Sequence, residues 1–246
     1  MVLSLKGAAV PGRLAPFSAE VEKGTLLHLV GPNGAGKSSL LALMAGMLSG
    51  EGEIQLLQRP LREWRAPALA RVRAWLPQQA APGLMPVYHY LRLHLSDARS
   101  PAALSGLLET LRLQDKLARP LTQLSGGEWQ RVRLAAAFAQ IDPALNPQGR
   151  LLLLDEPMTG LDIAQQNAVH NLIIGLLRAG VCVIASSHDL NHTLRHADRV
   201  WLMAQGSVVA QGAAAAILTP ERLSELYAIP FRQLELDGLP LLTVQP

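Results

Sequence analysis

Cysteine is almost absent from this sequence, because Cys182 is the only one among 246 residues. A single cysteine excludes an intramolecular disulfide and fits a reducing compartment. Cys182 lies in the apolar run 181–184, where a small buried hydrophobic residue is more common than a reactive thiolate. We therefore expect a structural cysteine and no catalytic thiol.

Long apolar runs and an export signal are also missing. No uninterrupted apolar run approaches the roughly 18 residues that a membrane-spanning helix needs, and no basic region followed by an apolar core opens the sequence. We therefore expect a chain that is soluble by itself. A mean hydropathy of +0.19 is somewhat apolar for such a chain, which leaves room for a surface that contacts a partner.

Aromatic content and net charge are both low. Phe, Trp and Tyr make up 4% of the residues, so we expect the core to use Leu, Val, Ile and Ala, within a hydrophobic content of 49%. The net charge of +3 is too small to indicate nucleic-acid binding by itself. Five arginines crowd one stretch, where we expect a solvated helical face, with phosphate or lipid-headgroup contact as the alternative: Arg59, Arg62, Arg65, Arg71 and Arg73.

Apolar runs alternate with helical periodicity along most of the chain, and this alternation predicts an α/β fold. Residues 1–25 are turn-rich and are expected to form edge strands. Residues 80–147 differ, because helical periodicity continues there without a strand-like run. We expect one domain in which residues 1–79 and 148–246 form the core and residues 80–147 form an inserted helical subdomain.

The individual elements follow from the same patterns. We expect strands at 26–30, 54–57, 151–155, 181–186, 200–203 and 208–210, the last two as a hairpin. We expect helices at 87–95, 102–113, 126–140, 163–178 and 190–196, with others starting near Lys37 and Pro220. Residues 67–75 are expected to be helical or loop-like, and residues 230–246 irregular with short strands.

One glycine-rich stretch carries the clearest chemistry. Residues 31–38 follow the apolar run 26–30 and precede a helix, which is the setting of a phosphate-binding loop. Backbone N–H groups can converge on an anion there, and the helix N-terminus adds about half a positive charge. Lys37 would reach the β- and γ-phosphates, and the Ser38 hydroxyl would ligate Mg²⁺. We expect nucleotide contacts from Gly31, Pro32, Asn33, Gly34, Ala35, Gly36, Lys37, Ser38 and Ser39.

Two carboxylates follow the apolar run 151–154. The carboxyl ends of buried parallel strands face the ligand crevice of α/β sheets, so Asp155 is expected to hold Mg²⁺ through water. Glu156 could orient or deprotonate a water that attacks the γ-phosphorus, a role that typically contributes about 10²–10⁴-fold. The alternative is that both carboxylates merely cap the next element, which the nearby phosphate loop disfavours.

A second glycine-rich stretch opens the helix expected at 126–140. Ser125, Gly126, Gly127 and Glu128 offer a hydroxyl and free N–H groups at this helix N-terminus, hence another anion site. One chain has little use for two γ-phosphate sites in different subdomains, whereas two chains arranged head to tail would use both. An ordinary serine-capped helix is the alternative.

The chain resembles ATP-binding cassette (ABC) ATPases along nearly its whole length. The resemblance is carried by stretches similar to the Walker A loop, Q-loop, signature motif, Walker B strand, D-loop and switch-histidine region, at 31–38, 76–78, 124–128, 151–156, 159–162 and 187–189. It implies a P-loop NTPase (RecA-like) core with an edge antiparallel β subdomain and an inserted α-helical subdomain.

The resemblance also implies a working homodimer that closes on two ATP molecules and opens after hydrolysis. Gln78 would sense Mg²⁺ and the attacking water, and His188 would contact the γ-phosphate beside Glu156. Ser125 and Gly127 would act on the ATP of the other protomer, and Asp162 would touch that protomer.

Three positions need comment against the family pattern. The aromatic residue that usually stacks on adenine has no counterpart in residues 8–14, where Arg13 could stack instead. Ser39 stands where threonine is usual. The glutamine of the Q-loop is either Gln78 or Gln79, and we favour Gln78 because it directly follows Leu-Pro.

Within this family, the chain is most similar to the ATPase subunits of bacterial vitamin B12 importers. The ATPases of siderophore and haem importers are closely related to these subunits. Distinctive stretches include residues 75–79, 86–90, 123–136 and 186–197. The resemblance implies a peripheral subunit on the cytoplasmic face of the inner membrane. It would dock on a permease dimer and be served indirectly by a periplasmic substrate-binding protein, without nucleic acid. An ABC-type protein acting on DNA or the ribosome is the competing class, but it usually has two cassettes or a long coiled-coil insertion.

The histidines outside these motifs receive structural roles. His192 and His196 are spaced i, i+4 and could ligate a metal, but no third ligand is placed beside them in sequence. We expect them on a polar helix face. His28, His89, His94 and His170 are expected to be structural.

Overall fold

The computed structural model describes residues 1–95 and 101–245, and a six-stranded sheet runs through it. The strand order is β10-β9-β3-β8-β7-β6, with β10 antiparallel to β9 and all other neighbours parallel. The bounds are Leu26–Val30 (β3), Arg73–Leu76 (β6), Leu151–Leu154 (β7), Cys182–Ser186 (β8), Arg199–Ala204 (β9) and Ser207–Ala213 (β10). Since parallel strands end at the same edge, the segments that follow β3, β7 and β8 meet there.

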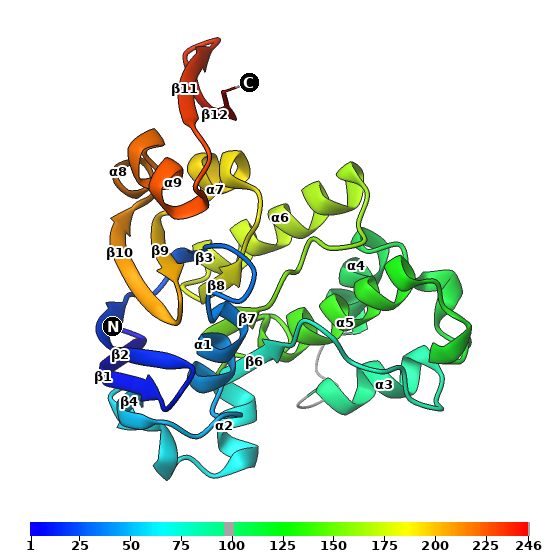
Figure 1. The fold of residues 1–246 in the computed structure, drawn as a ribbon. Coiled ribbons are helices and arrows are strands. Elements are labelled where there is room, and N and C mark those ends of the chain that lie inside the picture. Colours follow the sequence, from blue (N-terminus) through cyan, green and yellow to red (C-terminus); the bar gives the residue numbers. More distant parts are fainter. Residues whose placement is uncertain (96–100, 246) are drawn as a thin grey trace.

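A second, antiparallel sheet forms from the N-terminal residues, in the order β2-β1-β4-β5. Its strands are Leu3–Val10 (β1), Leu14–Val21 (β2), Glu51–Leu56 (β4) and Arg59–Pro60 (β5). It lies at the side of the molecule opposite α4 (Figure 1). The expected strands of residues 1–25 are therefore confirmed, but only β2 is an edge strand, because β1 lies between β2 and β4.

Helices occupy the stretch between β6 and β7, on the other side of the molecule (Figure 1). They are α3 (Val87–His94), α4 (Pro101–Thr110) and α5 (Gly126–Ile141). The remaining helices are α1 (Lys37–Met44), α2 (Ala66–Val72), α6 (Ile163–Arg178), α7 (Leu190–His196), α8 (Ala214–Ile217) and α9 (Pro220–Tyr227). In the ranges 1–95 and 101–245, no helix is long and apolar enough to cross a membrane.

The central sheet is covered on both faces, as the continuous apolar strands predict. Leu151 and Leu153 of β7 pack into one hydrophobic cluster together with side chains of α1 and β1. Leu152 and Leu154 pack into another, which contains side chains of α5 and α6. This division follows from the alternation of successive side chains along a strand.

The structure corrects two expectations for residues 59–75. The stretch expected to be helical or loop-like contains α2 but also β6, which pairs in parallel with β7 and forms the sheet edge. The arginine run is not wholly a solvated face, because Arg73 at the start of β6 is 6% exposed. Burial lowers the pKa of the Arg73 guanidinium to about 10.

The C-terminal tail is more regular than expected. It forms a hairpin of β11 (Phe231–Leu236) and β12 (Leu239–Val244), which projects from the rest of the molecule (Figure 1). The connecting residues Asp237 and Gly238 both have positive φ, at 53° and 76°, as the two-residue turns of tight hairpins require.

Candidate active site

The phosphate-binding loop links β3 to α1 at the edge where the parallel strands end. A glycine is needed at its start, because a Cβ on Gly31 would lie 2.2 Å from the carbonyl oxygen of Met203 in β9. The loop is also tied to the β9–β10 turn, where the Gly206 N–H donates to the Ala35 carbonyl at 3.1 Å. Asn33 and Gly34 at its tip are exposed, so the loop can receive a ligand from solvent.

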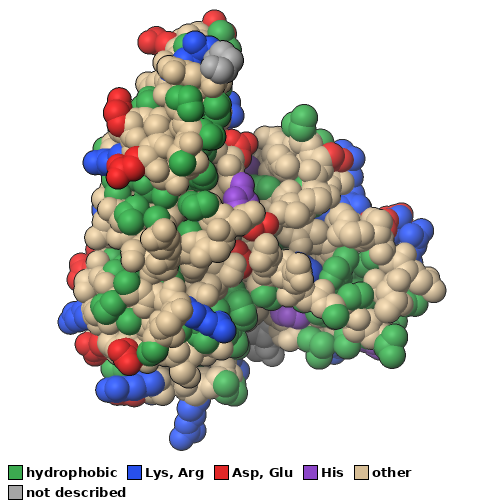
Figure 2. Space-filling view, in the orientation of Figure 1, with side chains coloured by type: hydrophobic (Ala, Val, Ile, Leu, Met, Phe, Trp, Pro, Cys, Tyr) green, Lys and Arg blue, Asp and Glu red, His purple; other side chains and the backbone are tan. Residues whose placement is uncertain are grey.

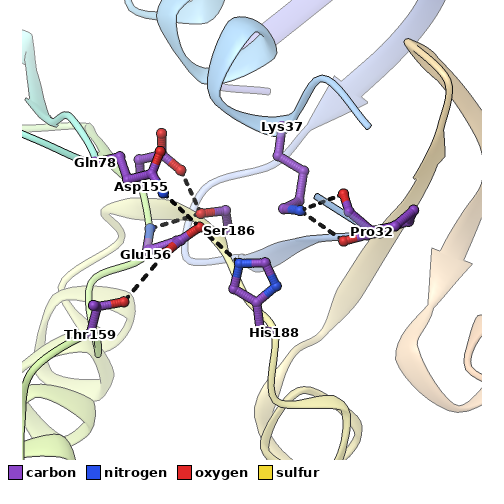
Figure 3. Close-up of polar contacts among 9 residues, drawn as sticks. Pro32, Lys37, Gln78, Asp155, Glu156, Thr159, Ser186 and His188 are labelled. Atoms are coloured by element: carbon purple, nitrogen blue, oxygen red, sulfur yellow. Dashed lines mark hydrogen bonds and ion pairs between the residues drawn. The ribbon is translucent and has the colours of Figure 1, made fainter. Parts of the chain in front are cut away.

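Lys37 at the start of α1 points toward this loop, and its side chain ends beside Pro32 (Figure 3). Its Nζ donates to the carbonyl oxygens of Gly31 at 2.7 Å and Pro32 at 3.0 Å. Burial lowers the pKa of the Lys37 ammonium, and the carboxylates of Glu156 and Asp155 act in the opposite direction. The ammonium is thus held close to where the loop would receive phosphate.

Asp155 and Glu156 directly follow β7, as expected, and Ser186 at the end of β8 ties them together. The Ser186 hydroxyl donates to Asp155 Oδ1 at 2.7 Å, and the Glu156 N–H donates to Ser186 Oγ at 2.7 Å. Asp155 is 3% exposed. Such a buried, hydrogen-bonded carboxylate keeps a fixed direction, which a ligand to a hydrated metal ion needs.

Glu156 is the centre of the polar contacts in Figure 3. Its Oε1 accepts hydrogen bonds from Gln78 Nε2 at 3.0 Å and from His188 Nε2 at 2.8 Å, and its Oε2 accepts one from Thr159 at 3.4 Å. Burial raises the pKa of Glu156, but the hydrogen bonds from these three side chains outweigh it and leave the pKa below its usual value. Glu156 is therefore ionised at neutral pH.

Gln78 comes from the segment after β6 and is held there by α5. Arg133 of α5 is 4% exposed, and its guanidinium donates to the carbonyl oxygens of Pro77 and Gln78. Arg133 also donates to Gln130 Oε1 at 2.9 Å, and Gln130 Nε2 donates to the Pro157 carbonyl at 3.0 Å. Two side chains of α5 thus hold both Gln78 and the residue after Glu156.

The second glycine-rich stretch forms the N-terminus of α5. Ser125 and Glu128 make reciprocal hydrogen bonds, from the Glu128 N–H to Ser125 Oγ at 3.2 Å and from the Ser125 N–H to Glu128 Oε2 at 2.8 Å. The backbone hydrogen bond from Ser125 is the main reason why the pKa of Glu128 is lowered. Within the described residues, no hydrogen bond joins residues 125–128 to the phosphate loop.

Asp162 begins α6, where its carboxylate accepts a hydrogen bond from the Gln165 N–H at 2.8 Å. The preceding turn lies against the start of α5, because a Cβ on Gly127 would be 2.8 Å from the Gly160 carbonyl oxygen. The α5 N-terminus and the turn after Glu156 are therefore in direct contact.

The sequence does not predict the roles of three contributors to this site: Thr159, Arg133 and Ser186. Arg133 and Ser186 act through contacts between segments that are distant in the chain, which no local pattern reveals. Thr159 lies three residues after Glu156, within the stretch 159–162, but its hydrogen bond depends on a side-chain direction that the sequence does not give. A local signal for Ser186 is that it ends a buried strand close to His188, at the edge where ligands bind.

Comparison with known proteins decides the family. A family described as ABC transporter matches residues 14–159, which is more than half of the chain and includes the phosphate loop, the α5 N-terminus and Glu156. The chain belongs to the ABC transporter family. Its fold is therefore the expected P-loop NTPase core with an antiparallel β subdomain and helices, and as a member of this family the chain is an ATP-binding transport ATPase.

Relatives and solved structures agree with this assignment. The chain is 52% identical to the vitamin B12 import ATP-binding protein BtuD of Salmonella heidelberg (strain SL476), over 98% of this chain and 97% of that protein. A solved ATP-binding subunit of an ABC transporter has a TM-score of 0.80 at 26% identity and covers 93% of this chain and 98% of its own. An inward-facing metal-chelate type ABC transporter has a TM-score of 0.76 at 25% identity, covering 100% of this chain and 97% of its own.

Proposed function

We propose that this chain is the ATP-hydrolysing subunit that energises vitamin B12 import. The observation that carries the substrate assignment is the 52% identity to a vitamin B12 import ATP-binding protein across nearly the full length of both chains. The chemistry is supported by the ionised Glu156, which lies across the site from Lys37 (Figure 3).

The residues present fit ATP and Mg²⁺. The loop amides and Lys37 would hold the phosphates, and Ser38, Asp155 and Gln78 supply the oxygen ligands that Mg²⁺ prefers. Among the described residues, no group of three His, Cys, Asp or Glu side chains is placed to hold a metal. This agrees with Mg²⁺, which binds through one or two carboxylates plus phosphate and water. When bound, Mg²⁺ neutralises charge that develops on the phosphates.

In this proposal Glu156 orients the attacking water and accepts its proton. Gln78 and His188 fix the carboxylate by hydrogen bonds to the same oxygen, Oε1, whereas Oε2 accepts a longer hydrogen bond from Thr159 at 3.4 Å. His188 is half-exposed, at 45% of its side chain, and can turn toward the γ-phosphate. Because Glu156 is ionised and held in place, its carboxylate can both orient the attacking water and accept its proton.

The proposal includes a homodimer that binds two ATP molecules between its protomers. Ser125, Gly126, Gly127 and Glu128 would meet the ATP held by the partner's phosphate loop, and Asp162 would lie at the protomer contact. Among the described residues, no hydrogen bond joins the two anion sites of one chain, which fits an arrangement in which each meets the nucleotide together with a second chain.

The proposed docking surface for a membrane permease dimer lies on residues 80–147, which we treat as a helical subdomain between the core parts 1–79 and 148–246. Exposed apolar side chains gather there, with Leu84 95%, Leu93 71% and Tyr88 45% exposed. A hollow of about 430 Å³ lies beside them, lined by Met85, His89, Arg92 and Leu93. Such a patch marks a contact with a partner. The subunit would sit on the cytoplasmic face of the inner membrane, served indirectly by a periplasmic substrate-binding protein.

Uptake of labelled cobalamin tests the substrate. Cells that lack their own B12-importer ATPase would be complemented with this chain or with its Glu156→Gln variant. We expect the wild type to restore uptake and the variant to fail, because the variant keeps the fold but loses the carboxylate that accepts the proton. No rescue by an expressed, ATPase-active wild type would contradict the vitamin B12 assignment.

The alternative is an importer of a siderophore or haem. The observation that favours it is the structural likeness to a metal-chelate type ABC transporter, since siderophores and haem bind iron as chelates. Cells that lack the ATPase of a siderophore or haem importer would be complemented with this chain. Restored uptake of labelled ferric siderophore or haem in these cells, without restored cobalamin uptake, would favour the alternative.

A further inference from the structure

Thr193 is a fully buried polar residue to which the proposed mechanism gives no role. It lies on α7, one turn after Asp189, and is 0% exposed. Its hydroxyl contacts two side chains from different segments, His28 Nδ1 at 2.9 Å and Ser187 Oγ at 3.0 Å. One of these belongs to the strand before the phosphate loop, and the other directly precedes His188.

The direction of these hydrogen bonds can be worked out from one end. The Ser187 hydroxyl donates to the Asp189 carbonyl at 3.3 Å, and a carbonyl can only accept. Ser187 Oγ must therefore accept from Thr193, whose hydroxyl has only one hydrogen. Thr193 must in turn accept from His28, which therefore carries its proton on Nδ1.

The neutral state of His28 agrees with this chain of bonds. His28 is 4% exposed on β3, and its ring stacks on that of His192 at 6.0 Å. Burial, followed by the neighbouring histidines His192, His170 and His196, lowers the pKa of His28 to about 3. His28 is therefore a neutral donor at neutral pH.

The chain of bonds fixes the backbone on both sides of His188. Ser187 also donates its N–H to the Leu29 carbonyl of β3 at 3.1 Å, and the Asp189 carbonyl accepts the Thr193 N–H at 3.0 Å. Among the described residues, Glu156 is the one hydrogen-bond partner of the His188 ring. The direction of its ring therefore depends on how firmly residues 187 and 189 are held.

We propose that Thr193 and His28 are positioning residues that tie the segment carrying His188 to the strand that ends in the phosphate loop. Through this link, the position of His188 is fixed relative to that of Lys37 across the site. The inference rests on the proposed roles of Glu156 and His188 in hydrolysis. The new element is the hydroxyl of Thr193. Without this hydroxyl, the ring of His188 is no longer held in one orientation.

Thr193→Val tests the inference, because valine keeps the shape of threonine but has no hydroxyl. We expect kcat for ATP hydrolysis to fall about tenfold, with the KM for ATP within about twofold of wild type. Thr193→Ser should restore most of the kcat, since it keeps the oxygen. Ser4→Ala, which removes a buried hydroxyl from β1 away from the site, is the matched control and should leave kcat unchanged.

Thermal unfolding of all four proteins separates positioning from a general loss of structure. A kcat for Thr193→Val within about twofold of wild type would overturn the inference, as would a parallel loss of kcat, ATP binding and melting temperature that Thr193→Ser does not rescue. If Thr193→Val does not fold, Ser187→Ala removes the next oxygen in the chain and should give the same kcat loss. A wild type without ATPase activity would instead contradict the proposed function.

Discussion

At the scale of single residues, the account depends on the surroundings of Glu156. The residue has φ of 49°, which places it in the left-handed region at the point where β7 leaves the sheet. Its N–H is held by Ser186 and its Oε1 by Gln78 and His188. A side chain so constrained has one direction available, which is what orienting a water requires.

The lowered pKa values of the buried histidines predict that the folded chain loses stability in acid. The pKa of His28 is about 3 in the folded chain against 6.5 usually, so the unfolded chain binds more protons below pH 6.5. Stability therefore falls as the pH falls from 6.5 toward 3. From pH 7.5 to pH 5.5 His28 alone should cost about 1.4 kcal/mol of unfolding free energy, measured by urea unfolding at both values.

The pKa values of His170, His192 and His196 are also lowered, first by burial, so their effect on stability has the same sign. His28→Asn is the control, because asparagine does not titrate and can still donate to Thr193. Its unfolding free energy should depend less on pH than that of wild type. An equally steep dependence in both proteins would mean that His28 is not held neutral in the folded chain.

At the scale of elements, the site depends on the junction between β6 and α3. Gln78 follows β6, contacts Glu156 and is held by Arg133 of α5. A movement of α5 would therefore shift Gln78 relative to Glu156. This is a physical route by which events at the helices could reach the site of hydrolysis.

Gln78→Ala tests this junction. We expect ATP affinity to stay within about twofold of wild type, while substrate transported per ATP hydrolysed falls, because Gln78 transmits the position of α5. Both rates would be measured in vesicles that contain the assembled transporter. Gln79→Ala is the matched control, since Gln79 is the adjacent exposed residue and should behave as wild type. Equal losses of ATP affinity and transport in Gln78→Ala would refute the coupling role.

Most elements could be predicted because their sequences are long or clearly bounded. Helix α6 at Ile163–Arg178 matches its predicted bounds, since Asp162 and Gly180 mark its ends in the sequence. Strand β6 could not be predicted, because it has only four residues, begins with a charged Arg73 and ends before Pro77. Its place at the sheet edge comes from pairing with β7, which is information that lies elsewhere in the chain.

The residues of the candidate site likewise fall into those that the sequence predicts and those that it does not. The phosphate loop, Asp155 and Glu156 carry local signals, because a glycine pattern and a buried strand end are readable in sequence. The contributions of Ser186, Thr193 and Arg133 arise only when β8 lies beside β7, α7 beside β3, and α5 beside the segment after β6. No spacing rule connects residues that are so far apart along the chain.

At the scale of the whole molecule, the proposed function assigns partners to two surfaces of one chain. Figure 2 shows acidic and histidine side chains in the hollow between the part with the sheets and the part with α4 and α5. The other is the proposed docking surface on the helical part, where Leu84, Tyr88 and Leu93 are exposed. A second copy of the chain at the first and a permease at the second would cover both.

The most direct test of the account is the oligomeric state and turnover of the Glu156→Gln variant with ATP and Mg²⁺. Glutamine keeps the size of the side chain but cannot accept the proton, so ATP should bind without being hydrolysed. We expect light scattering to show a stable dimer that holds two ATP molecules, and turnover to fall at least about 100-fold. The same variant without nucleotide should be monomeric. Hydrolysis at the wild-type rate, or a monomer at saturating ATP, would contradict the account.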